Sequence, residues 1–345
     1  MRFLGSVVAS FNMEITNHCA LACPECARTN NPWLRRNLTQ LPLDLLKRIF
    51  PLSAADSLRG IKLNLCGAYG DCIYHRAFHE IAAYLKAVGF LLNVETNGSH
   101  RPQAWWERTC DILSDEDVIT FSVDGLEDTN HVYRVNSRWQ DILTAMRTCA
   151  SRKRVVWKFI VFRHNEHQLE EARRLARELG VRHLIFKKSA RFREADPLAP
   201  RDEQFVGTVS RNRQQLRRLL GQGLPPEMLD REVRILPKCV FGKNAAITAR
   251  GYFYPCTSCE SGDPDSWFTL HQGECDLRSR SLEEIFASPH WAELEASWSR
   301  ASTAPAICLR TCGVHGDFVE RYKAESRANR PNMPEDIVSF DLDED

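Results

Sequence analysis

The sequence has no long apolar run and no excess of charge of one sign. Its 345 residues include 46 Lys and Arg against 45 Asp and Glu, which leaves a net charge near +1. That balance supplies no one-sided basic field for a phosphate backbone, so nucleic acid is not favoured as a partner. No segment is long and apolar enough for a membrane helix, so we expect no membrane association.

The amino end lacks a complete secretion signal. The opening Met1-Arg2-Phe3-Leu4 is followed by polar Asn12, Glu14 and Asn17, with neither an apolar stretch nor a cleavage site between them. We therefore predict a cytoplasmic protein whose first strand starts almost at Met1.

Cysteine is the residue type that stands out, with 13 copies. Three lie within Cys19–Cys26 and six lie between Cys239 and Cys312. In a reducing compartment, clustered cysteines indicate metal binding or catalysis rather than a disulfide framework.

Up to about residue 188 the sequence alternates short apolar or β-branched runs with helical patterns. The predicted strands are residues 10–15, 61–65, 91–95, 118–123, 156–162 and 183–187. The predicted helices are residues 43–50, 78–88, 103–113, 139–150 and 166–179, the last ended by Gly180. Six strand–helix units in series predict an α/β fold with a parallel sheet, a partial (β/α)6 barrel of TIM type whose chemistry lies at the carboxyl ends of its strands.

Composition changes further along the chain predict four regions. We expect the partial barrel at 1–188, a charged and proline-rich bridge with one helix at 189–236, a smaller cysteine-rich domain at 237–325, and an acidic tail at 326–345.

The first cysteine cluster directly follows the first predicted strand. Its spacing is Cys-x3-Cys-x2-Cys, formed by Cys19, Cys23 and Cys26. Three thiolates this close can hold one face of a [4Fe–4S] cubane and leave the fourth iron without a protein ligand, whereas zinc normally takes four ligands. With the strand–helix series that follows, the motif resembles the radical S-adenosylmethionine (SAM) superfamily. One departure is Glu25, where many members carry an aromatic residue.

Later segments resemble the SAM-binding segments of that family, in the same order. Residues 66–71 (Cys-Gly-Ala-Tyr-Gly-Asp) resemble its Gly-Gly-Glu-Pro segment, and Gly70 and Asp71 would then receive the methionyl amine of SAM. Residues 121–125 (Phe-Ser-Val-Asp-Gly), followed by Tyr133-Arg134, resemble the stretch in which Ser122 contacts the ribose and Arg134 the carboxylate.

The second cysteine cluster resembles the SPASM and twitch domains of the same superfamily. Eleven residues separate Cys239 from Gly251, and four more lead to Cys256. A hairpin turning at Arg250-Gly251 is expected to bring the two cysteines together. With Cys308 and Cys312 they would hold one auxiliary [4Fe–4S] cluster. A structural zinc on the same four cysteines is the alternative, and Cys259 and Cys275 are left over.

The resemblance implies reductive cleavage of SAM to a 5′-deoxyadenosyl radical, with flavodoxin or ferredoxin as electron donor. The radical would remove a hydrogen atom from a peptide, as in the maturation of ribosomally made peptides. A separate partner would then present the peptide, because we expect no leader-binding domain before the first strand.

Two other functions stay open. The first is a dehydrogenase or epimerase of a small molecule such as a sugar or antibiotic precursor. An epimerase would need a thiol hydrogen donor, for which the candidates are Cys66, Cys72, Cys259 and Cys275. The second is a non-catalytic, zinc-binding module.

Metal content separates these hypotheses. Protein purified without oxygen is expected to be brown and to contain roughly eight irons per chain, which is the content of two cubanes. Iron and zinc analysis checks this, and a colourless zinc protein would contradict it.

Overall fold

The computed structural model describes residues 2–3, 6–67, 69–189, 196–205, 211–242, 244–259, 266–319 and 337–341. The chain divides into two units. The barrel unit consists of Asn12–Thr208, Thr248–Arg250 and Met333–Asp345, and the cysteine-rich unit consists of Met1–Phe11, Val209–Ile247 and Gly251–Asn332. The predicted domain boundaries after residues 188, 236 and 325 stay predictions, because units of contact need not coincide with functional domains.

The barrel unit is built on a curved sheet with strand order β3-β4-β5-β6-β7-β8-β13. Strands β4 to β8 run parallel. The strands are β3 (Ser10–Met13), β4 (Lys62–Leu65), β5 (Leu91–Thr96), β6 (Val118–Ser122), β7 (Arg154–Ile160), β8 (His183–Lys187) and β13 (Ile337–Asp341). The predicted α/β partial barrel is thereby confirmed.

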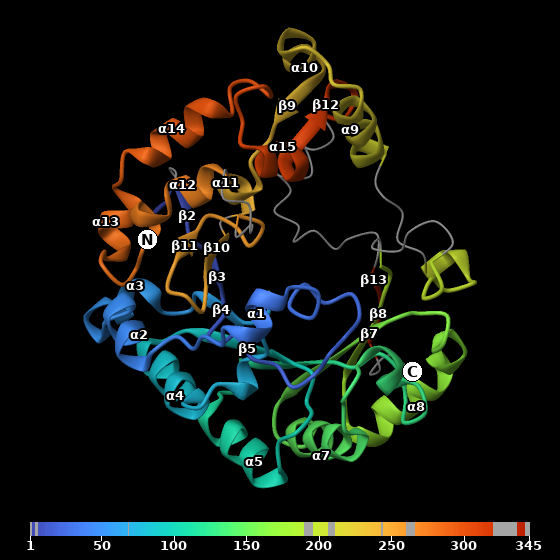
Figure 1. Cartoon of the computed structure of the whole chain (residues 1–345). Coiled ribbons are helices and arrows are strands. Elements are labelled where there is room, and N and C mark those ends of the chain that lie inside the picture. Colours follow the sequence, from blue (N-terminus) through green and yellow to red (C-terminus); the bar gives the residue numbers. More distant parts are fainter. Residues whose placement is uncertain are drawn as a thin grey trace. The chain divides into compact units, whose positions relative to one another are not determined.

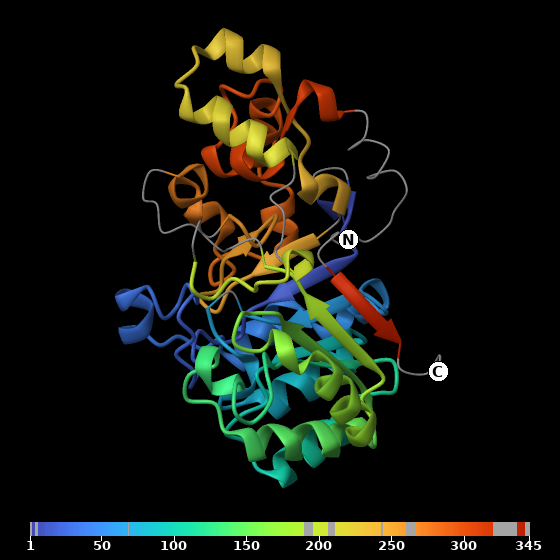
Figure 2. The same ribbon diagram turned by 90° about the vertical axis from the view of Figure 1, so that its right-hand side faces the viewer.

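Strand β13 is an addition to the predicted sheet. It pairs antiparallel with β8, from Ile337 opposite Lys187 to Asp341 opposite His183, and Figure 2 shows the two arrows side by side. It lies within the stretch that the sequence predicts as an acidic tail. The run Ile337-Val338-Ser339-Phe340 within that stretch is largely apolar, and it was the signal that could have found the strand.

Helices cover the outer side of the parallel strands, as Figure 1 shows for α4, α5, α7 and α8. In α8 Ala172, Ala176 and Leu179 lie on one face and are buried, and Gly180 ends the helix with a left-handed φ of +76°. None of the described helices is long and apolar enough to cross a membrane. The helices of the unit are α1 (Pro32–Arg36), α2 (Leu43–Ile49), α3 (Ala55–Leu58), α4 (Phe78–Val88), α5 (Gln103–Ile112), α6 (Asn130–Tyr133), α7 (Trp139–Ala150) and α8 (Leu169–Leu179).

The two faces of the sheet differ in polarity. On each strand every second side chain faces the helices. These side chains are apolar and fully buried, among them Phe121, Trp157 and Phe186. The opposite face carries amides and a hydroxyl that form a hydrogen-bonded row across four strands. Its bonds run from Asn64 Nδ2 to Asn12 Oδ1 (3.1 Å), from Asn93 Nδ2 to Asn64 Oδ1 (3.2 Å) and from Thr120 Oγ1 to Asn93 Oδ1 (2.9 Å). A polar inner face of this kind suits a site that binds polar ligands.

The cysteine-rich unit contains two small antiparallel pairs besides its helices. Strands β10 and β11 form the hairpin predicted at Arg250-Gly251, where Gly251 has a φ of +82°. Strands β9 and β12 form the second pair. The strands are β1 (Arg2–Phe3), β2 (Ser6–Val7), β9 (Val233–Ile235), β10 (Asn244–Ile247), β11 (Phe253–Tyr254) and β12 (Gly313–His315). The helices are α9 (Arg211–Gly221), α10 (Pro226–Glu232), α11 (Lys238–Gly242), α12 (Trp267–Leu270), α13 (Leu282–Phe286), α14 (His290–Ser297) and α15 (Ala306–Cys312).

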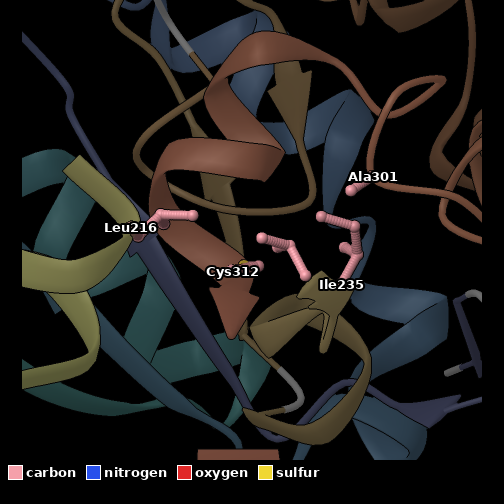
Figure 3. Packing of buried hydrophobic residues seen from close by; sticks show 5 residues of the cluster. Leu216, Ile235, Ala301 and Cys312 are labelled. Atoms are coloured by element: carbon pink, nitrogen blue, oxygen red, sulfur yellow. The ribbon is translucent and has the colours of Figure 1, made fainter. Parts of the chain in front are cut away.

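A small core joins α9, β9 and α15 of this unit. Leu216, Ile235, Ala301 and Cys312 point toward one another in Figure 3, and each is less than a tenth exposed. The last residue of α15 is therefore held in a packed environment. That packing fixes one predicted metal ligand, Cys312, in place.

A buried ion pair fixes the start of β6 and gives a test of the barrel's stability. Asp117 is fully buried, and its carboxylate accepts from Lys86 Nζ (2.8 Å), Leu92 N (2.7 Å) and Ser114 N (2.7 Å). Asp117→Ala is expected to lower the free energy of unfolding by about 3 kcal/mol, because it leaves Lys86 and two amides without their acceptor.

Urea unfolding followed by tryptophan fluorescence measures this change. Asp115→Ala is the matched control, since Asp115 is 97% exposed in its pair with Lys153 and should cost little. Equal effects of the two substitutions would contradict the prediction.

Candidate functional site

The loop after β3 brings the three amino-terminal cysteines together. Cys19 and Cys26 pack against an apolar cluster that includes Cys23, Tyr133 and Phe162. Within the loop Cys26 N donates to Cys23 O at 3.1 Å, and Ala22 N donates to Val135 O at 3.0 Å. The three cysteines, which are close in sequence, therefore lie in one patch at the carboxyl ends of the strands.

Burial makes the charged form of these sulfurs unfavourable. It raises the pKa of the Cys19 thiol to about 12, with a further increase from Asp71 and an opposing effect from Arg28. Burial also raises the pKa of Cys23, opposed by Arg134, which donates a hydrogen bond to it. Metal ligation requires thiolates, and the positive charge of an iron–sulfur core would offset the cost of burying them. The three residues fit such a group.

Two side chains from elsewhere in the barrel unit reach the sulfurs. Asn97 follows β5, and its Nδ2 lies 3.7 Å from Cys19 Sγ. Arg134 follows α6, and its Nε donates to Asp124 Oδ2 at 2.6 Å. Asp124 is fully buried and also accepts from Ile160 N at 2.7 Å through Oδ1. Asp124 therefore orients Arg134 toward Cys23. The sequence motif contained Asp124, but nothing in it indicated this role.

Gly70 and Asp71 lie on the loop after β4, directly against the start of the cysteine loop. Asp71 N donates to His18 O at 2.9 Å, and a Cβ on Gly70 would lie 1.9 Å from Thr16 O. The amides of Tyr69 and Gly70 donate to Glu14 Oε1, at 2.8 and 3.0 Å. Glu14 was missed by the sequence reasoning, although it alternates with the buried residues of β3.

The carboxylate of Asp71 lies among hydrogen-bond donors of the protein itself. Oδ2 accepts from Thr96 Oγ1 (3.0 Å) and Asn97 N (2.7 Å), and Oδ1 accepts from Ile73 N (3.2 Å). Burial raises its pKa to about 6 against the effect of these donors. The carboxylate ties the loops after β4 and β5 together. Its predicted contact with the methionyl amine stays a prediction.

Ser122 lies on the inner face of the sheet beside an ion pair. Its Oγ donates to Glu95 Oε1 at 3.4 Å, and Lys158 Nζ lies 3.0 Å from Glu95 Oε2. Cys66, on the neighbouring strand end, has a pKa raised to about 12 by burial and by Glu95. Glu95 and Lys158 were not predicted. Polar residues at every second position of otherwise apolar strands were the signal that could have found them.

The second cysteine set lines one pocket in the cysteine-rich unit. Cys239, Cys256, Cys308 and Cys312 lie around it, and Cys259 is a fifth member. Cys256 and Cys259 have their sulfurs 3.3 Å apart. Cys275 lies elsewhere, fully buried, with its Sγ 3.8 Å from His290 Nε2. The structure therefore separates the two leftover cysteines.

Neither cysteine set converges on one point. In the part of the chain that the structure describes, no group of three or more His, Cys, Asp or Glu side chains is arranged to hold a single metal ion. A cubane presents its irons at separate corners, so its cysteine ligands need not meet at one centre.

Comparison with known proteins gives a family match for part of the barrel unit. Residues 13–179 match the sequence profile described as the radical SAM superfamily. The chain carries a radical SAM domain. The matched segment contains Cys19, Cys23, Cys26 and every predicted SAM contact. The four carboxyl-terminal cysteines lie outside it, so the auxiliary cluster stays a prediction.

Solved structures share the fold of this protein at low identity. SuiB of Streptococcus suis bound to S-adenosylmethionine matches with a TM-score of 0.53 and 13% identity over 75% of this chain and 62% of that longer chain. SuiB bound to precursor peptide SuiA gives 0.54 and 13% over 82% and 65%. Native anSMEcpe with bound AdoMet and Cp18Cys peptide gives 0.53 and 13% over 93% and 97%. The chain thus spans less than two thirds of SuiB in two of these matches.

Close packing at Gly70 gives a test of the predicted SAM contacts. Gly70→Ala places a methyl group against Thr16 O and should displace the loop that carries Asp71. We expect the Kd for SAM of the cluster-loaded protein to rise about tenfold, which equals about 1.4 kcal/mol.

Equilibrium dialysis with labelled SAM measures this Kd. Gly221→Ala is the control, because nothing lies within 4 Å of the added Cβ there. An unchanged Kd for Gly70→Ala would show that this loop is not part of the SAM site.

Proposed function

We propose that this radical SAM enzyme removes a hydrogen atom from a peptide substrate. The observation that supports it most is the shared patch of Cys19, Cys23 and Cys26, with Asn97 and Arg134 directed at its sulfurs. These cysteines would hold a [4Fe–4S] cluster, which with SAM and one electron supplies a 5′-deoxyadenosyl radical for hydrogen abstraction.

The residues around the patch would bind and orient SAM. Asp124 holds Nε of Arg134 at 2.6 Å, so the terminal guanidinium nitrogens face the cysteine loop and suit the carboxylate of SAM. Gly70 and Asp71 would lie against the methionyl amine, and Ser122 against the ribose. The apolar cluster with Tyr133 and Phe162 would keep water from the reacting centre. Flavodoxin or ferredoxin would supply the electron.

Two observations support a peptide as the substrate. Two of the similar solved structures hold peptides, the precursor peptide SuiA and the Cp18Cys peptide. The inner face of the sheet also offers amides and the Glu95–Lys158 pair, which suit backbone and charged groups of a peptide. We propose that a separate protein presents the peptide.

A second candidate function rests on Cys66. This thiol lies at the inner face beside Glu95 and Lys158, and burial keeps it protonated. A protonated thiol can give a hydrogen atom to a carbon radical and become a thiyl radical, which then needs an electron and a proton to be restored. Such a step would make the enzyme an epimerase of a small molecule or of a peptide.

For the cysteine-rich unit we propose one auxiliary [4Fe–4S] cluster on Cys239, Cys256, Cys308 and Cys312. Their common pocket supports it, and Cys259 could replace Cys256 because their sulfurs are 3.3 Å apart. The cluster would accept an electron from the substrate radical or order the unit. A structural zinc on the same cysteines is the competing proposal.

Cys23→Ala tests the proposed chemistry. The variant should form no 5′-deoxyadenosine from SAM under reducing conditions, because one of three ligands is lost, while about four irons stay in the cysteine-rich unit. Chromatography of the product and iron analysis measure both quantities.

Cys149→Ala is the control, since Cys149 is buried between outer helices and should keep wild-type cleavage. Formation of 5′-deoxyadenosine by Cys23→Ala would refute the ligand assignment.

Neighbouring genes and labelled substrates would separate the two substrate classes. A short reading frame beside the gene provides a candidate peptide, and transfer of deuterium from the labelled peptide to 5′-deoxyadenosine would support the first proposal. Genes for sugar or antibiotic synthesis, with no such transfer, would favour a small molecule.

A further inference from the structure

Arg28 is a buried cation beside the cysteine loop. The protein itself does not satisfy all of its hydrogen-bond donors. Arg28 lies two residues after Cys26 and is only 8% exposed. One terminal nitrogen donates to Leu21 O within the loop. Its Nε is buried and has no hydrogen-bond partner. Buried donors in folded proteins are nearly always paired, so this one indicates an acceptor supplied by a ligand.

The guanidinium of Arg28 lies against the cysteine loop, because it donates to the carbonyl of Leu21, between Cys19 and Cys23. No ion pair within the described residues involves Arg28. Arg134, by contrast, is neutralised by Asp124 at 2.6 Å. Arg28 is therefore the cation near the sulfurs whose charge the protein leaves uncompensated, and a buried charge of this kind needs an anion.

We propose that Arg28 is a positioning residue of the cluster, which stabilises its negative charge and raises the potential at which it accepts an electron. The inference rests on the proposed cluster at Cys19, Cys23 and Cys26. Three thiolates and four sulfides outweigh the iron charge, and reduction adds one further negative charge. A cation in a buried environment stabilises the reduced form more than the oxidised form. The free Nε–H would donate to a cluster or thiolate sulfur, and such hydrogen bonds also raise the potential.

The test compares two substitutions of Arg28 in the full-length, cluster-loaded enzyme. Arg28→Gln keeps an N–H donor and removes the charge, whereas Arg28→Lys keeps the charge. The midpoint potential is measured by redox titration followed with EPR. The amino-terminal cluster is recognised because its signal changes when SAM is added, since it alone is proposed to have an open iron.

Arg28→Gln should disfavour reduction at least tenfold, a shift of about 59 mV to lower potential for one electron. Arg28→Lys should stay close to the wild type. The control is Arg36→Met, because Arg36 on α1 is exposed and solvent screens its charge.

A loaded Arg28→Gln variant with an unchanged potential would overturn the proposal. Loss of the cluster from both Arg28 variants would also overturn the proposal. In that case the positive charge kept in Arg28→Lys would not have been enough to hold the cluster. If only Arg28→Gln loses the cluster, the charge requirement is supported. Wild-type protein without a SAM-sensitive signal would instead contradict the proposed cluster itself, so the two failures are distinguishable.

Discussion

Negative charge on sulfur within an apolar cluster is the constraint on which the barrel unit depends. Burial raises the pKa of Cys19 and Cys23, so the protein alone does not favour their thiolates. Arg134, Arg28 and the amide of Asn97 are arranged around the sulfurs and offset part of this cost. An iron–sulfur cluster would supply the rest, which would explain why Arg28 has a buried Nε without a partner beside an otherwise apolar patch.

The sheet meets this constraint through the contrast between its two faces. Apolar residues such as Phe121 and Trp157 bind the sheet to its helices, which gives a rigid support. The inner face carries Asn64 and Asn93 in a hydrogen-bonded row, and Glu95 with Lys158 lies nearer the carboxyl ends. The loops that leave these ends bring distant segments to the cysteines. Positions far apart in sequence are thus fixed by strands rather than by long loops.

Much of this could be predicted from the sequence. Periodic apolar runs gave the strands and helices of the barrel, and Gly180 gave the end of α8. Close spacing gave the first cysteine set. The partner of Arg134 could not be found, because its pairing with Asp124 depends on how two loops fold back. Arg28 could not be found either, since its significance comes from burial and a missing partner. Cys259 could not be distinguished from Cys256 by spacing alone.

The three amino-terminal cysteines are proposed to hold a cluster with one iron free for SAM. Pulsed ENDOR spectroscopy of the reduced protein with SAM labelled with ¹⁵N and ¹⁷O in its methionyl amine and carboxylate tests this directly. We predict strong hyperfine coupling of both labels to the cluster, lost in a Cys23→Ala variant. Absence of coupling in reduced, cluster-loaded wild-type protein saturated with SAM would contradict the account.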